Sequence, residues 1–412
     1  MKLTLIDIDR SLRQQGSCLK DHGLPYVEDD TTELGRELLN YGENLQRTIV
    51  EDWVPKLSPD QRRVFEYVRS LLLNPRDRRT SRIIFLDGPG GYGKTSLIRV
   101  ILAYVRGCRQ VALAVASSGI AARNMDGGTT AHSMFRLPLD LGHGTGVWNI
   151  TNGSQRAELI RAAQLIVFDE APMAHRYIFE MIDRSLRDLM NSSVPFGNKI
   201  FICSGDFRQI APVVEKARTH QLMSRRERES LIPLTGVRCL TSLADLITDV
   251  FPPGVLRDPD LCARRAILST LNVNVKEING RILDLMDGRI HELRSADTVD
   301  REDDDGLDVD VKSPQPGHWF AFAEGSPLRV CRRQFPLMLA YCMTGHKSQG
   351  QTIEYVGVDL RTDCFTHGQL YVLLSRVRRP DDIVVLVPDD RIVEGVAYAK
   401  NIVYDELLLN TD

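Results

Sequence analysis

Short apolar runs alternate with amphipathic stretches in two parts of the chain. Apolar runs of this length, bounded by polar or glycine-rich segments, predict buried strands, and the stretches between them have helical spacing. The runs expected to form strands are residues 83–86, 111–116, 165–168 and 200–203 in the first part, and 337–343, 355–358 and 383–387 in the second. Such alternation is typical of parallel sheets flanked by helices, so the pattern predicts two α/β domains.

The segments around these two parts have a different pattern. The predicted division is an N-terminal extension at 1–54, a first α/β domain at 55–215, an irregular segment at 216–330 and the remainder of a second domain at 331–412. The irregular segment would hold the start of the second domain, a basic run at 225–228 and an acidic run at 297–310. Charge runs are usually solvated surface, so we expect most of this segment to be exposed loop.

The first apolar run leads directly into a phosphate-binding pattern, GxxxxGKT. Its glycines let the backbone turn tightly enough for N–H groups to converge on phosphate oxygens. Lys94 supplies a charge for the β- and γ-phosphates, Thr95 offers a hydroxyl to Mg²⁺, and a helix predicted from Leu97 adds its positive N-terminal end. The nucleotide-binding residues expected here are Gly88, Pro89, Gly90, Gly91, Tyr92, Gly93, Lys94 and Thr95. The alternative is a glycine-rich turn without a ligand.

Two adjacent carboxylates, Asp169 and Glu170, follow the run at 165–168. A strand that ends there places both side chains at the C-terminal edge of the sheet, beside the phosphate loop. Asp169 would hold Mg²⁺ directly or through water, and Glu170 would polarise the attacking water, because phosphoryl transfer to water needs positioning and charge stabilisation. The alternative is a pair that caps the next helix.

Further polar residues follow later strands. Gln209, after the run at 200–203, is placed to sense the γ-phosphate. Arg376, in a helix predicted at 369–379, is the candidate arginine finger, because a guanidinium has a planar fork and a fixed charge that suit a transferring phosphate. A surface arginine at a helix end is the alternative. His132 and His346 are equally compatible with structural roles, and nothing suggests that they bind a metal.

Composition limits the class of protein. With 412 residues and 43% hydrophobic content, the chain can bury two cores, and its net charge of −3 argues against a histone-like protein but not against a local basic channel for nucleic acid. Eight cysteines form no CxxC pair, so neither a zinc site nor a disulfide scaffold is indicated. No run approaches the roughly 18 apolar residues of a membrane span. We therefore expect a soluble intracellular protein without a membrane partner.

Together these motifs resemble those of superfamily-one 5′-to-3′ DNA helicases of the Pif type, and most closely the helicase region of Helitron transposon proteins. The similarity covers most of residues 57–215 and 331–390, and the matching motifs stand in the family's order. The segments that carry the resemblance are residues 57–61 with Gln61, 88–95, 116–133, 169–173, 205–209, 345–352 and 371–376.

The resemblance implies a P-loop NTPase fold of two RecA-like domains, the second shortened or interrupted, with ATP between them and single-stranded DNA across both. Gln61 would sense the adenine. The implied activity is that of an ATP-dependent 5′-to-3′ helicase or translocase acting on single strands and duplex junctions, in repair, recombination, telomere maintenance or transposition. Its location would be the nucleus, or the cytosol for a prokaryotic or viral protein. The implied DNA contacts are Ser118, Thr130, His132, His346, Lys347 and Ser348.

The chain also departs from the family pattern between residues 214 and 327. It lacks the arginine-bearing motif expected at the start of the second domain and the segment that leads into a small inserted barrel; Arg238 or Arg257 could substitute for the arginine. One alternative function is therefore a decayed, helicase-derived protein that binds nucleotide and DNA without unwinding. Another is a phosphate-loop ATPase that remodels protein partners, against which the DNA-type segments at 116–133 and 344–352 argue.

Overall fold

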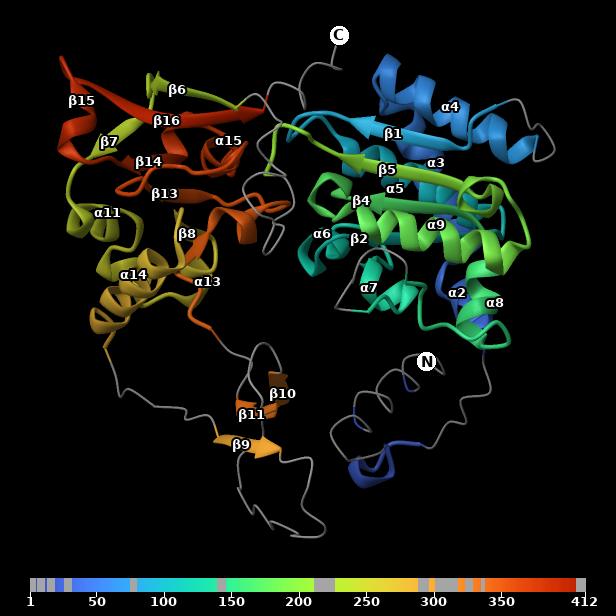
Figure 1. Cartoon of the computed structure of the whole chain (residues 1–412). Coiled ribbons are helices and arrows are strands. Elements are labelled where there is room, and N and C mark those ends of the chain that lie inside the picture. The colour runs from blue at the N-terminus through green and yellow to red at the C-terminus, as the bar shows by residue number, and fades with distance from the viewer. Residues whose placement is uncertain are drawn as a thin grey trace.

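Two α/β bodies lie side by side in the computed structural model, the N-terminal one at the right of Figure 1 and the C-terminal one at the left. The structure describes residues 5, 12, 19–25, 32–74, 80–138, 146–210, 227–287, 296–300, 318–322, 329–334 and 338–404. Within those ranges, no helix combines the length and apolar character that a membrane crossing needs.

The first body is built on a five-stranded sheet in which every neighbouring pair of strands is parallel. In spatial order its strands are β1 (Ile83–Asp87), β5 (Ile200–Gly205), β4 (Ala163–Asp169), β2 (Val111–Ala116) and β3 (Thr129–Thr130). All six residues of β2 are buried, as expected for a central strand covered on both faces. The four strands predicted in this part of the sequence are confirmed.

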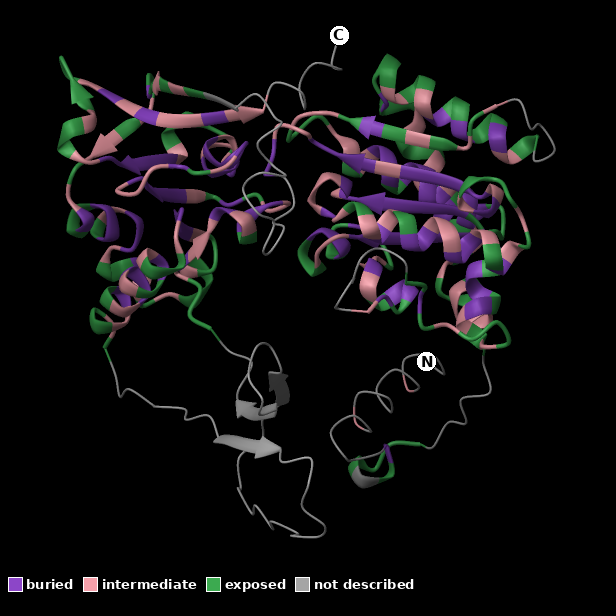
Figure 2. Cartoon of the chain, in the orientation of Figure 1, coloured by how far each residue is buried: buried purple, intermediate pink, exposed green. Residues whose placement is uncertain are grey.

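Helices cover both faces of this sheet, and the residues of β4 show how. Leu165 and Val167 pack into one core and Ile166 and Phe168 into the other, because successive side chains of a strand point to opposite faces. The helices in the first core are α4 (Pro59–Leu73), α5 (Lys94–Gly107) and α6 (Gly119–Arg123); those in the second are α7 (Ala131–Phe135), α8 (Gln155–Ala162) and α9 (Arg176–Met190). The purple strands of Figure 2 lie between these layers.

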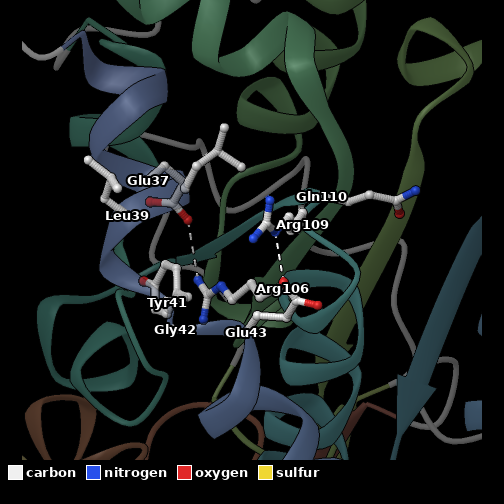
Figure 3. Close-up of a pocket in the computed structure, with 9 residues that line it drawn as sticks. Glu37, Leu39, Tyr41, Gly42, Glu43, Arg106, Arg109 and Gln110 are labelled. Atoms are coloured by element: carbon white, nitrogen blue, oxygen red, sulfur yellow. Dashed lines mark hydrogen bonds and ion pairs between the residues drawn. The ribbon is translucent and has the colours of Figure 1, made fainter.

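Two helices from the N-terminal part, α2 (Glu33–Asn40) and α3 (Glu43–Trp53), pack on the first body. α3 lies against α5, and Gln46 and Arg47 of α3 lie beside Gly107 of α5. The guanidinium of Arg106, 4% exposed, sits 3.6 Å from the ring of Tyr41. Figure 3 shows Arg106 and Tyr41 at a cavity of about 550 Å³.

The second body also holds a five-stranded sheet with parallel neighbours throughout. Its strands, in spatial order, are β12 (Cys342–Thr344), β8 (Arg265–Ser269), β13 (Tyr355–Asp359), β14 (Ile383–Leu386) and β7 (Arg238–Leu240). Helices α11 (Leu243–Val250) and α14 (Asn272–Asp284) pack on one face. The other face is covered by α15 (Gln369–Leu374) and by β16 (Val396–Tyr404), which pairs antiparallel with β6 (Glu227–Pro233) and β15 (Ile392–Val393).

Some expectations for the second half are wrong. Most of residues 227–287 is regular structure and not exposed loop, and β8 is an interior strand, with Ala266 and Leu268 in one core and Ile267 in the other. The helix expected at 369–379 ends at Leu374. The strand expected at 337–343 begins only at Cys342, and residue 337 lies outside the described residues.

An antiparallel three-stranded sheet interrupts the chain between α14 and β12. Its spatial order is β10 (His318–Phe322), β11 (Arg329–Gln334) and β9 (Ala296–Asp300). The predicted acidic run begins inside β9 and continues, from residue 301, outside the described residues. Of the basic run, residues 225 and 226 also lie outside them, whereas residues 227 and 228 belong to β6.

Gly205, the last residue of β5, allows the turn after β4 to pack against the first sheet. A Cβ added at Gly205 would overlap the ring of Pro172, which lies in the 3₁₀ turn η3 (Ala171–Met173) directly after Glu170. The missing side chain at position 205 therefore helps to set where the carboxylates at the end of β4 lie.

We predict that Gly205→Ala lowers the free energy of unfolding by about 2 kcal/mol, because neither the ring of Pro172 nor the strand can move aside without strain. Gly119→Ala is the control, since a Cβ at Gly119 meets nothing within 4 Å; we expect a change within about 0.5 kcal/mol. Urea unfolding of both variants measures the difference. Equal losses in the two variants would show that this close approach is not a constraint.

Candidate active site at the domain cleft

A cleft of about 670 Å³ separates the C-terminal edge of the first sheet from the segment that follows α15. All four residues expected to be catalytic line it: Lys94, Glu170, Gln209 and Arg376. Thr95 and Asp169, the residues expected at the metal, line it as well. Its volume falls within the roughly 300–1,000 Å³ of typical small-molecule sites. The fold therefore brings together residues that are up to 282 positions apart, Lys94 and Arg376.

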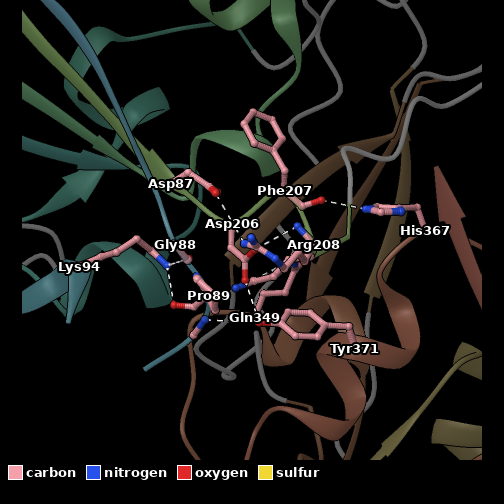
Figure 4. A network of polar contacts seen from close by, with 12 residues as sticks. Asp87, Gly88, Pro89, Lys94, Asp206, Phe207, Arg208, Gln349, His367 and Tyr371 are labelled. Carbon is pink, nitrogen blue, oxygen red and sulfur yellow. Dashed lines mark hydrogen bonds and ion pairs between the residues drawn. The ribbon is translucent and has the colours of Figure 1, made fainter. Parts of the chain in front are cut away.

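The phosphate loop joins β1 to α5 and has the expected backbone conformation. Gly91 and Gly93 have φ values of +82° and +79°, a left-handed region that glycine enters without strain. Lys94 Nζ donates to the carbonyl oxygen of Gly88 and, at 3.1 Å, to that of Pro89 (Figure 4). The ammonium is thus held at the mouth of the loop, where a bound phosphate would compete with these carbonyls for it.

Gln61 supports this loop from the start of α4. Its Nε2 donates to the carbonyl oxygen of Tyr92 at 3.1 Å, and its Oε1 accepts from the backbone N–H of Ser58 at 3.0 Å within a capping box. A Cβ at Gly93 would come within 2.6 Å of the same Nε2. Neither Gln61 nor Gly88 lines the cleft. In this structure Gln61 therefore braces the loop backbone, and its adenine-sensing role stays a prediction.

The carboxylates lie at the end of β4, where the chain turns sharply. Glu170 has φ 52° and ψ 42°, a left-handed conformation that is uncommon for a residue with a side chain. Burial raises the pKa of Asp169. Burial, followed by the charge of Asp169, raises the pKa of Glu170 to about 7, while Lys94 and Arg376 oppose the shift. A carboxyl group that titrates near neutral pH is suited to accept a proton from water.

The residues present fit a magnesium ion bound together with a nucleotide. Thr95 and Asp169 offer a hydroxyl and a carboxylate to one cleft, and Mg²⁺ in nucleotide sites typically takes one or two protein oxygens beside phosphates and water. These two side chains would hold the ion, which would neutralise phosphate charge.

The loop that follows β5 is held by the second body. Tyr371, on α15, donates its hydroxyl to Asp206 Oδ2 at 3.0 Å and accepts from the backbone N–H of Gly90 at 3.4 Å. His367 accepts at Nδ1 from the N–H of Tyr404 at 2.9 Å, so its Nε2 carries the proton that it donates to the carbonyl oxygen of Phe207 at 2.8 Å. Figure 4 shows this network reaching from the phosphate loop to α15.

Gln209 lies further along this loop, close to the side-chain amide of Gln349. Gln349 Nε2 lies 3.5 Å from Gln209 Oε1 and 3.4 Å from the carbonyl oxygen of Ile210. Asn124 makes another contact between the two bodies, donating Nδ2 to the carbonyl oxygen of Gly350 at 3.1 Å. Sequence spacing did not predict that Asn124, His367 or Tyr371 would contact the opposite body, because spacing along one chain does not encode which surfaces face each other.

Arg376 lines the cleft on the side opposite Lys94, as the arginine-finger hypothesis requires. Its guanidinium is 4% exposed and already donates four hydrogen bonds within the second body. The acceptors are the carbonyl oxygens of Val372 (2.9 Å), Ser348 (3.3 Å) and Gln351 (3.4 Å) and the hydroxyl of Ser375 (2.7 Å). Arg238 pairs instead with Asp249, and Arg257 with Asp287 at 3.3 Å; neither lines the cleft.

The residues expected at DNA have mixed surroundings. The hydroxyls of Ser118 and Thr130 accept from backbone N–H groups at the starts of α6 and α7, at 3.2 and 3.3 Å. Lys347 is exposed. Ser348 is fully buried and donates to the carbonyl oxygen of Gly345 at 2.8 Å, so it offers no surface to a DNA strand.

The two histidines expected at DNA, His132 and His346, are each partly buried. Burial lowers the pKa of both imidazoles, which favours their neutral forms.

Comparisons with known proteins bear on this site. Residues 56–232 match the model of the family described as PIF1-like helicase. The ATP-dependent DNA helicase PIF1 of Danio rerio is 26% identical over 429 residues, an alignment that takes in 85% of this chain and 64% of the relative. The chain thus spans less than two thirds of that relative's length. The resemblance to Pif-type helicases inferred from the motifs is confirmed.

Two solved structures show the fold. The Pif1 helicase of Candida albicans aligns with a TM-score of 0.52 at 21% identity, over 80% of this chain and 94% of its own. Bacteroides Pif1, in complex with ADP-AlF3 and single-stranded DNA, aligns with a TM-score of 0.51 at 21% identity, over 78% and 91%. The two parallel sheets of this protein are therefore two RecA-like domains, confirming the predicted fold class.

We predict that Glu170 makes stability depend on pH. Burial raises the pKa of Glu170 to about 7 in the folded protein. Its contribution to the free energy of unfolding is therefore complete at a pH below the pKa that Glu170 has in the unfolded chain, and it is lost as the pH rises through 7. Relative to wild type, Glu170→Gln should gain about 2 kcal/mol of unfolding free energy between pH 5 and pH 8. Urea unfolding at both pH values measures the gain. Glu158→Gln, at an exposed position of α8, should show none; a pH-independent difference for Glu170→Gln would contradict the prediction.

We also predict that Tyr371 and Asp206 stabilise the protein as a pair. In a double-mutant cycle of Tyr371→Phe and Asp206→Asn, the coupling energy should be about 1–2 kcal/mol, since the hydroxyl donates to a carboxylate that is 1% exposed. The matched cycle pairs Asp206→Asn with Tyr398→Phe, at a half-buried tyrosine of β16. Coupling of the same size in both cycles would exclude a specific interaction.

Proposed function

We propose that the protein is an ATP-dependent DNA helicase or translocase that couples ATP hydrolysis to 5′-to-3′ movement along single-stranded DNA. The observation that carries the proposal is the single cleft in which Lys94 and Glu170 of the first domain lie opposite Arg376 of the second. A nucleotide bound there would contact both domains, so binding and hydrolysis would change how they meet. The polarity follows from the family resemblance alone.

The residues of the cleft divide the chemistry between them. Lys94 and the N–H groups of the phosphate loop would hold the triphosphate, and Thr95 and Asp169 would hold Mg²⁺. Glu170, with its pKa raised to about 7, would accept the proton of the attacking water. Arg376 would supply a fixed positive charge from the second domain, close enough to Glu170 to oppose the rise of its pKa.

The contacts of the 3₁₀ turn η5 (Gly345–Ser348) support coupling to DNA. Arg376 donates to the carbonyl oxygen of Ser348, and Gln349, the next residue, meets Gln209 from the first domain. Lys347, exposed in the same turn, is the proposed phosphate contact. A change at the nucleotide would therefore move the segment that touches DNA.

DNA would be held mostly through its phosphates, by Lys347 and by the N-terminal ends of α6 and α7. Such binding tolerates any sequence and weakens as salt rises. We place the activity on single strands and duplex junctions, in repair, recombination, telomere maintenance or transposition. A eukaryotic protein would act in the nucleus, and a prokaryotic or viral one in the cytosol.

The second candidate function is a helicase-derived protein that binds nucleotide and DNA without unwinding. One observation favours it: Arg238 and Arg257, the two residues considered as substitutes for the missing arginine motif, are paired away from the cleft. If two second-domain arginines are needed for fast hydrolysis, neither of these supplies the second.

We predict that single-stranded DNA stimulates ATP hydrolysis at least tenfold, and that Lys94→Ala lowers the stimulated rate by at least about 100-fold through loss of charge at the phosphates. Lys276→Ala, on an exposed face of α14, is the control and should retain the wild-type rate. A duplex with a 5′ single-stranded tail should be unwound and one with a 3′ tail should not.

The alternatives give different results in the same assays. Tight ATP binding by folded wild-type protein, with no turnover, would establish the non-unwinding function. Hydrolysis that is indifferent to DNA would contradict both DNA-dependent functions and favour an ATPase that acts on proteins.

A further inference from the structure

We propose that Arg378 binds the γ-phosphate of the nucleotide from the second domain with its whole fork, and that it does so beside Arg376, most of whose N–H groups are already engaged within that domain. The inference deepens the proposed function and rests on it. It assigns a nucleotide contact to a residue outside the motifs from which the site was predicted.

The hydrogen bonds of Arg376 limit what it can give to a ligand. A guanidinium has five N–H donors, and four hydrogen bonds from Arg376 already end on acceptors of its own domain. Bidentate recognition of a phosphate needs two parallel N–H groups. One remaining donor cannot supply that geometry, and freeing a second would leave a carbonyl or hydroxyl of Ser348, Gln351 or Ser375 without its partner.

Arg378 has the opposite properties. It lies two residues further along, is exposed, and lines the same cleft as Lys94 and Thr95. It makes no hydrogen bond or ion pair with any residue that the structure describes. Its whole fork is therefore available to a ligand, and its exposed side chain can change rotamer without breaking a contact in the protein.

Charge in the cleft points to the same residue. Among the described residues of the second domain that line the cleft, the cations are Arg376 and Arg378. Arg376 shares this cleft with Glu170 and lies close enough to oppose the rise in the pKa of that carboxyl group. Part of its charge is thus already balanced by the protein, whereas the charge of Arg378 has no acidic partner there and is available for a phosphate.

Arg379 provides a matched control next in the sequence. It is exposed as well, but its Nε and Nη2 donate to the two carboxylate oxygens of Asp382 at 2.9 and 3.0 Å, and it does not line the cleft. If positive charge near the end of α15 acted only in a general way, Arg378→Ala and Arg379→Ala would weaken nucleotide binding equally. If Arg378 contacts the nucleotide directly, only Arg378→Ala would weaken it.

The experiment measures binding of a non-hydrolysable ATP analogue and of ADP to the full chain, with Mg²⁺, for wild type and for Arg378→Ala, Arg378→Lys and Arg379→Ala. We expect Arg378→Ala to weaken analogue binding at least tenfold and ADP binding less than threefold, since a charge-assisted contact to the terminal phosphate is absent from ADP. Arg378→Lys should recover part of the loss, because it keeps the charge but not the fork. Arg379→Ala should stay within twofold of wild type.

Two results would overturn the inference: unchanged analogue binding in Arg378→Ala, or equal losses in Arg378→Ala and Arg379→Ala. Thermal unfolding of each variant shows that it is folded, which the exposure of both arginines leads us to expect.

Failure of this inference can be distinguished from failure of the proposed function. If Arg378→Ala binds normally while Lys94→Ala abolishes DNA-stimulated hydrolysis, the function stands without this contact. If wild type hydrolyses no ATP, the function fails, and the binding comparison still tests Arg378.

Discussion

Two adjacent acids in a buried cleft are the constraint on which the rest of the structure depends. Asp169 and Glu170 end β4 side by side, and burial raises the pKa of each. Keeping such groups ionised out of water is costly unless cations lie nearby. Here the cations come from both domains, Lys94 from the phosphate loop and Arg376 from the segment after α15. The charge state of Glu170 therefore depends on where the second domain lies.

Several contacts between the domains involve one loop of the first domain. The loop after β5 carries Asp206 and Gln209, which meet Tyr371 and Gln349 of the second domain. Both partners are neutral hydrogen-bonding groups, which can exchange one acceptor for another at little cost, whereas a buried ion pair cannot. Tyr371 also accepts from the N–H of Gly90 in the phosphate loop, so a phosphate that took this N–H would change a bond that reaches into α15. We regard this exchange as the physical basis of the proposed coupling.

The sequence predicted the first domain better than the second for a physical reason. β1 runs into a glycine-rich loop and β4 into two acids, so the ends of these two strands were marked in the sequence. β8 has five residues, Arg265–Ser269, and its flanks carry no such signal, although it is an interior strand of the second sheet. Likewise, the phosphate loop predicted Lys94 and Thr95, but the bracing of Tyr92 by Gln61 and the meeting of Tyr371 with Asp206 depend on tertiary packing.

Packing also decides how the N-terminal helices relate to the site. The sequence pattern predicted that residues 1–54 form an extension. In the structure, residues from this part cover Arg106, which lies at the far end of the helix that begins at Lys94. Arg106 is buried beneath Tyr41 and lies 3.6 Å from Glu37. The same guanidinium donates to the carbonyl oxygen of Asp126 at 2.9 Å, in the loop after α6. A buried arginine is tolerated only when acceptors surround it, so removing α2 together with Tyr41 would leave it without an acid and a ring. The helix α5 therefore links the proposed nucleotide-binding loop, at its start, to the proposed DNA-binding segment that includes α6. The N-terminal residues complete the packing around the far end of α5.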